Sequence, residues 1–122
     1  MARILVVDDE PHIVRLVAFA LEKRGHEIIQ ANDGPSGIEA ARTKHPDLIL
    51  MDVMMPLMTG LEALEQLKAD KTTSEIPVVM LSAKSQEYEQ NAGLERGAVK
   101  YVCKPFTPSA LGDVVTEVLD AT

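Results

Sequence analysis

Leu48-Ile49-Leu50-Met51-Asp52 is the stretch from which the fold can be inferred. Four apolar residues follow one another without polar alternation, which predicts a strand that is buried on both faces. Asp52 follows at the carboxyl end of this strand, which is where an open α/β sheet holds its ligands. Because a carboxylate beside a core needs a partner, we expect the rest of the chain to supply one for Asp52. Asp47, before the strand, is interpreted as a solvated residue.

The composition is that of one soluble globular domain. The chain has 122 residues, 46% hydrophobic and 25% charged, so residues 1–122 are expected to form a single domain with no appended output domain. The net charge of −7 argues against direct binding to nucleic acid. A lone cysteine, Cys103, excludes an internal disulfide and suits a reducing compartment. No signal peptide and no apolar stretch of about 20 residues is present, so we expect a cytoplasmic protein without a membrane segment.

Apolar runs and turn residues predict five strands that alternate with five helices. This alternation indicates parallel βαβ units with right-handed crossovers, and therefore an α/β fold with a doubly wound, five-stranded parallel sheet. The predicted strands cover residues 4–7, 27–31, 47–51, 76–81 and 99–103. The predicted helices begin at Pro11, at the turn 32–35, near Leu61, at about Gln86 and at Pro108, which follows the N-cap Thr107.

Charged and hydroxyl side chains stand at the predicted carboxyl ends of four strands: Asp8 and Asp9, Asp52, Ser82, and Lys104. In a parallel sheet these ends share one edge, so the five side chains should meet although the sequence separates them. Three crowded carboxylates repel one another, and an oxygen-preferring cation such as Mg²⁺ relieves that repulsion. Carboxylates can form aspartyl phosphates, and a metal ion with an ammonium would neutralise the phosphoryl oxygens.

In this arrangement the chain resembles a response-regulator receiver domain of two-component signalling, the CheY-like family, over essentially its whole length. The motifs that carry the resemblance are Asp8-Asp9, Asp52 followed by Met55-Pro56 and Gly60, Ser82, and Lys104-Pro105. Each motif is weak alone, but all of them in this order are highly specific. The resemblance implies a flavodoxin-like (βα)5 fold with the strand order 2-1-3-4-5.

The resemblance also implies the acceptor and the metal ligands. Asp52 matches the phosphoacceptor of the family. Asp9 matches a direct Mg²⁺ ligand, and Asp8 matches the acid that usually holds the ion through water. The backbone carbonyl of Met54 matches the third protein ligand, and Mn²⁺ could replace Mg²⁺.

A second group of residues matches the switch of the family. Ser82 matches its hydroxyl, and the backbone N–H of Ala83 is expected to bind the phosphoryl group as well. Tyr101 matches the aromatic residue that changes rotamer. Lys104 matches the phosphate-binding lysine, and its bond to Pro105 is expected to be cis.

The resemblance implies a phosphorylation-activated switch rather than an enzyme, one that assists only its own phosphorylation and dephosphorylation. The expected donor is a sensor histidine kinase or a histidine phosphotransfer protein. Phosphorylation is expected to reshape the surface of the fourth predicted helix, the fifth strand and the last helix, which controls an unidentified downstream protein. The chain is expected to be a monomer that could dimerise when phosphorylated.

Three alternatives were weighed. An enzyme of the haloacid dehalogenase type needs a second acid two residues after the nucleophile, where this chain has Met54. A flavin or nucleotide binder needs a glycine-rich or hydroxyl-rich loop after the first strand, where Asp8-Asp9-Glu10 would repel phosphate. The third alternative is a receiver that only scaffolds and never turns over phosphate; Mg²⁺-dependent labelling separates it from a switch.

Overall fold

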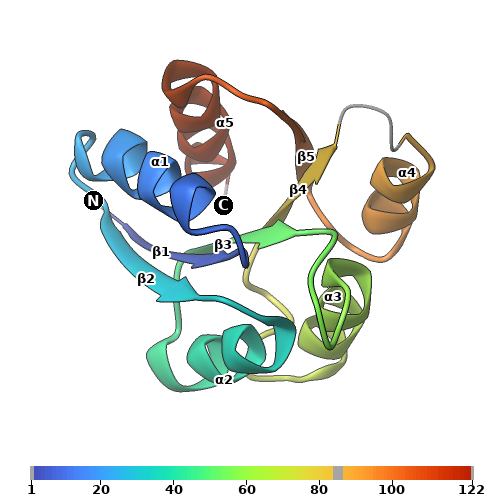
Figure 1. The fold of residues 1–122 in the computed structure, drawn as a ribbon. Coiled ribbons are helices and arrows are strands. Elements are labelled where there is room, and N and C mark those ends of the chain that lie inside the picture. The colour runs from blue at the N-terminus through green and yellow to red at the C-terminus, as the bar shows by residue number, and fades with distance from the viewer. Residues whose placement is uncertain (1, 84–86, 122) are drawn as a thin grey trace.

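The computed structural model describes residues 2–83 and 87–121, but not the side chains of residues 83–90. The chain forms a parallel sheet that helices cover on both faces (Figure 1). The strand order β2-β1-β3-β4-β5 confirms the flavodoxin-like fold expected from the resemblance. The strands are β1 (Arg3–Val7), β2 (Glu27–Ala31), β3 (Leu48–Asp52), β4 (Val78–Ala83) and β5 (Lys100–Lys104). The helices are α1 (Pro11–Glu22), α2 (Gly34–Lys44), α3 (Gly60–Ala69), α4 (Glu87–Glu95) and α5 (Pro108–Asp120). The predicted start of the fourth helix at residue 86 lies outside the described residues.

The run Leu48–Met51 is continuous because successive side chains of β3 enter opposite cores. Leu48 and Leu50 pack under α1 and α5, in one cluster with Leu21 and Leu111. Ile49 and Met51 belong to the cluster under α2 and α3. Every residue of β3 is buried, so a strand at the centre of the sheet fixes the position of Asp52.

Three strands extend further toward their carboxyl ends than the sequence predicts. Asp52 pairs with Leu81 and is the last residue of β3, whereas the prediction ended the strand at Met51. β4 covers residues 78–83 rather than 76–81, and β5 covers 100–104 rather than 99–103. The predictions ended each strand where polar residues begin, but backbone pairing decides the end of a strand and polar side chains do not interrupt it. Asp52, Ser82 and Lys104 therefore stand on the sheet itself.

The loop after β3 is fixed to the strand by Gly60. A Cβ atom at this position would collide with the backbone oxygen of Asp52, so only glycine permits the close approach. The Gly60 N–H donates a hydrogen bond of 2.8 Å to the carbonyl of Val53. Thr59 then caps α3 in a capping box with Glu62. The loop thus leaves Asp52 in a defined orientation.

Among the described residues, no helix has the length and apolar character needed to cross a membrane.

Candidate functional site

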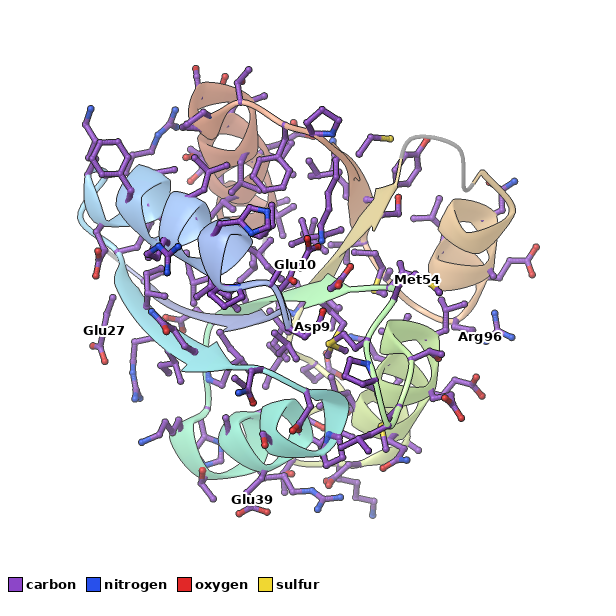
Figure 2. All side chains as sticks on the ribbon, viewed as in Figure 1. Asp9, Glu10, Glu27, Glu39, Met54 and Arg96 are labelled. Carbon is purple, nitrogen blue, oxygen red and sulfur yellow. The ribbon has the colours of Figure 1, made fainter. Side chains whose placement is uncertain are left out.

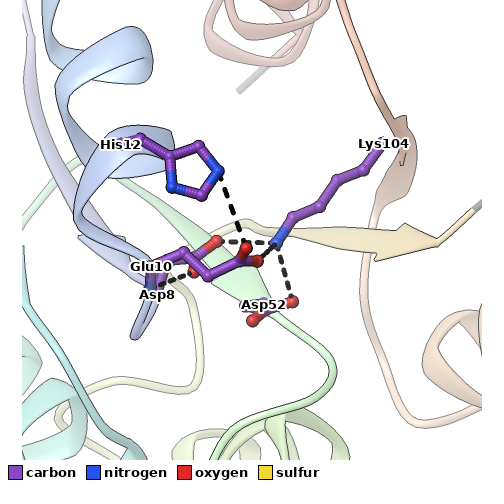
Figure 3. Close-up of polar contacts among 5 residues, drawn as sticks. All are labelled: Asp8, Glu10, His12, Asp52 and Lys104. Carbon is purple, nitrogen blue, oxygen red and sulfur yellow. Dashed lines mark hydrogen bonds and ion pairs between the residues drawn. The ribbon is translucent and has the colours of Figure 1, made fainter.

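The carboxyl ends of β1, β3 and β5 bring three predicted site residues together (Figure 3). The Lys104 ammonium lies 2.9 Å from Asp8 Oδ2 and 3.2 Å from Asp52 Oδ1. It also lies 3.1 Å from Oε1 of Glu10, which follows β1. One cation is therefore shared by three carboxylates: Asp52 at the end of β3, and Asp8 and Glu10 in the segment between β1 and α1.

The members of this cluster differ in burial. The side chain of Asp8 has no exposed surface, that of Asp52 is 6% exposed and that of Lys104 is 16% exposed. The side chain of Glu10 is 46% exposed. Backbone N–H groups hold the two buried acids: that of Glu10 donates to Asp8 Oδ1 at 2.9 Å, and that of Met54 donates to Asp52.

The environment raises the pKa of Asp52 from 3.8 to about 6. Burial is the main cause and the charge of Asp8 adds to it, whereas Lys104 and the Met54 N–H oppose the shift. Burial also lowers the pKa of Lys104, but its hydrogen bond to Asp8 and the charges of Asp52 and Asp8 hold that pKa above its ordinary value. At neutral pH Asp52 is therefore mostly an ionised carboxylate beside a fully charged lysine.

The other predicted residues on β4 and β5 are placed by strand register and exposure. Ser82 is buried on β4 and pairs in register with Cys103, one position before the pair Ala83 and Lys104. Tyr101, on β5, is 40% exposed. The bond between Lys104 and Pro105 is cis, which confirms the prediction from the resemblance.

Glu10 belongs to the cluster and sequence reasoning missed it, whereas Asp9 lies outside it. Asp9 is exposed, and no cluster of three or more acids among the described residues includes it. Figure 2 shows Asp9, Glu10 and Met54 near the carboxyl ends of β1 and β3, with Glu27 and Glu39 at the periphery. The sequence signal for Glu10 was its place in a run of three acids, Asp8-Asp9-Glu10, directly after a predicted strand. Which of these side chains turn toward the site depends on where α1 begins.

The donor set of the cluster fits a divalent cation that prefers oxygen. One carboxylate oxygen from each of Asp8, Glu10 and Asp52 lies within 4.8 Å of the others. Such an all-oxygen set suits Mg²⁺, which usually binds one or two carboxylates and keeps several waters. The residues present are thus compatible with a magnesium ion.

Comparison with known proteins agrees with the fold. The family model for the response regulator receiver domain matches residues 4–116. The protein PilH of Pseudomonas aeruginosa is 40% identical, and the match covers 98% of each chain. The alkaline phosphatase synthesis transcriptional regulatory protein PhoP of Bacillus subtilis is 43% identical to this chain. The match covers 96% of this chain and 48% of that protein, so this chain spans about half the length of that relative. The structure of the chemotaxis response regulator CheY4 of Vibrio cholerae is 31% identical, with a TM-score of 0.91 and coverage of 97% and 98%.

The chain belongs to the response regulator receiver domain family. Receiver domains of this family are phosphorylation-activated signalling modules of two-component systems that accept phosphate from histidine kinases and bind Mg²⁺ at an acidic pocket. The family therefore acts as a signalling switch rather than as a conventional enzyme.

Proposed function

We propose that this receiver accepts a phosphoryl group on Asp52 from a sensor histidine kinase or a histidine phosphotransfer protein, and thereby switches the α4–β5–α5 surface. One observation carries the proposal. A buried carboxylate at the end of the central strand lies 3.2 Å from the partly buried ammonium of Lys104, and a second buried acid shares that ammonium. Such a pair can position an anionic phosphoryl group and neutralise it.

The reaction uses the side chains of this chain in distinct roles. An oxygen of the ionised Asp52 carboxylate forms a bond to phosphorus, while the phosphorus–nitrogen bond of the donor phosphohistidine breaks and the imidazole leaves with the bonding electron pair. Lys104 donates hydrogen bonds to the phosphoryl oxygens as charge develops there. The product is an acyl phosphate on Asp52. With a pKa of about 6, Asp52 is available as the anionic nucleophile at neutral pH.

The metal proposal follows the resemblance. Asp8, Asp9 and Asp52, with the backbone carbonyl of Met54, would hold Mg²⁺, and Mn²⁺ could replace it. The ion would neutralise the negative charge that phosphoryl transfer concentrates at this edge. The cluster of Asp8, Glu10 and Asp52 supports a cation site here, and the carboxylate of Glu10 adds to the negative charge of that site.

The switch proposal depends on a change of charge. Phosphorylation adds about −1.5 to −2 charges beside Ser82 and the backbone N–H of Ala83, which can donate to the new oxygens. Movement of Ser82 would open space into which Tyr101 turns from its exposed position. Exposed apolar side chains already mark this side of the molecule, at Leu94, Val99 and Tyr101.

The partner of this surface is proposed as an unidentified downstream protein rather than nucleic acid, because the chain has a net charge of −7. We propose that the chain acts as one receiver domain in the cytoplasm, as a monomer that could dimerise when phosphorylated.

The direct test compares labelling of three proteins by a small acyl phosphate donor with Mg²⁺. We expect the wild-type protein to incorporate phosphate and Asp52→Asn to incorporate none. Asp47→Asn is the matched control, because it makes the same substitution just before the other end of β3, and it should be labelled like the wild type. Phosphate incorporation by Asp52→Asn would contradict the site. A wild-type protein that stays unlabelled would favour the scaffolding alternative.

A further inference from the structure

The three acids around Lys104 are not equally committed to it. A lysine ammonium has three N–H donors and no acceptor, and each of its three carboxylate partners lies within hydrogen-bond distance. The donors are therefore all occupied before any phosphoryl group is present. If Lys104 is to bind a phosphoryl oxygen, one of these contacts has to be given up.

Two of the three partners are fixed. Asp8 is fully buried and its second oxygen accepts from a backbone N–H, so loss of its contact with Lys104 would leave a buried charge poorly compensated. Asp52 belongs to the central strand and accepts a hydrogen bond from the Met54 N–H. Burial and these hydrogen bonds keep both carboxylates away from solvent.

Glu10 is the partner that can leave. Its side chain is 46% exposed, and although Glu10 is the N-cap residue of α1 its side chain makes no capping hydrogen bond. Its second oxygen lies 3.7 Å from Nε2 of His12, whose side chain is exposed (Figure 3). Release of Lys104 therefore costs Glu10 little, because water and His12 remain available as partners.

We propose that Glu10 is a displaceable third partner of Lys104, which occupies one ammonium donor in the unphosphorylated receiver and yields it to a phosphoryl oxygen on Asp52. This inference rests on the proposed function and adds a positioning residue to it. A carboxylate oxygen of Glu10 lies within 4.8 Å of one of Asp52, so the anionic phosphoryl group also repels it toward solvent. Glu10 thus competes with the phosphoryl group and restrains activation.

The test measures how tightly beryllofluoride, a phosphoryl mimic, binds at saturating Mg²⁺. We expect Glu10→Gln to bind it about two- to fivefold more tightly than the wild type, since a partly exposed charge interaction is worth up to about 1 kcal/mol. Glu39→Gln makes the same charge change on α2, at the periphery, and should leave affinity unchanged (Figure 2). Weaker or unchanged binding by Glu10→Gln would overturn the proposal, because a residue that merely holds Lys104 in place should help the mimic.

A double-mutant cycle with Lys104→Gln separates competition for the lysine from general repulsion. If Glu10 acts by occupying an ammonium donor, most of the gain from Glu10→Gln should disappear once Lys104 is replaced. An equal gain in both backgrounds would overturn the proposal. Failure of the proposed function and failure of this inference give different results. A wild-type protein that binds no beryllofluoride and takes no phosphate refutes the proposed function. Normal wild-type binding with no effect of Glu10→Gln refutes only this inference.

Discussion

The central strand β3 and the edge strand β5 each contribute one charged side chain to the same site, yet they are held very differently. All five residues of β3 are buried, and β3 pairs with β1 on one side and with β4 on the other. Among the strands that the structure describes, β5 pairs only with β4, and of the five residues of β5 only Val102 is buried. Asp52 thus stands on a fixed support, whereas Lys104 stands on a strand that solvent reaches.

This difference indicates which part of the molecule can respond to a change of charge. Movement of β3 would disturb both hydrophobic cores at once, because its alternate side chains enter both. Movement at β5 and α4 disturbs much less: of the described α4 side chains, at 91–95, Ala92 and Gly93 are buried and Leu94 is exposed. The proposed acceptor and the surface proposed to respond therefore lie on strands that are held differently.

The largest predicted contrast is in stability. Leu50→Ala in β3 should lower the free energy of unfolding by about 2–5 kcal/mol, because it opens a cavity in a fully buried cluster. Tyr101→Ala in β5 should lower it by only about 1 kcal/mol, because the side chain is already 40% exposed. Urea unfolding of both variants measures the contrast. Equal losses would show that the two strands are equally constrained.

A smaller change in the free energy of unfolding should come from the charge of Asp52 on β3. Burial and the charge of Asp8 raise the pKa of Asp52 from 3.8 to about 6, so between these values the folded state holds a proton that the unfolded chain has lost. Stability should therefore fall as pH rises through this range. Without divalent cations, Asp52→Asn should be more stable than the wild type at pH 7 by about 1–3 kcal/mol, and the gain should vanish below about pH 4.

Urea unfolding at a series of pH values measures this gain. Asp47→Asn, on an exposed residue before the strand, serves as the control. A gain that persists unchanged at acidic pH would mean that ionised Asp52 is not the source of the destabilisation.

The smallest predicted effect is on dynamics. When beryllofluoride and Mg²⁺ bind, amide hydrogen exchange in α4 and β5 should change by up to about tenfold, since β5 lies at the edge of the sheet with mostly part-exposed side chains and Leu94 of α4 is exposed. Exchange in β3 should stay at the rate set by global unfolding. Mass spectrometry of peptides from the two regions makes the comparison within one sample. A change in β3 as large as that in α4 would remove the distinction between the two strands.

Much of the fold could be predicted from local features of the sequence. The run Leu48–Met51 indicated a strand buried on both faces, and the structure confirms this with two separate cores. Alternation of strands and helices then implied a parallel sheet, and such a sheet necessarily collects its carboxyl ends at one edge. For this reason Asp8, Asp52 and Lys104 could be grouped although as many as 96 positions separate them.

The tertiary structure decided what local patterns do not encode. Strand ends depend on pairing with a neighbour, and the ladder continues through Asp52, Ser82 and Lys104 beyond the predicted limits. The direction of each acid after β1 depends on the first turn of α1, which directs Glu10 toward Lys104 and leaves Asp9 exposed. Sequence alone thus determined that carboxylates and an ammonium gather at one sheet edge, because the carboxyl ends of parallel strands share that edge. Only the tertiary structure determined which of these side chains contact one another, because the backbone conformation at each residue sets where its side chain points.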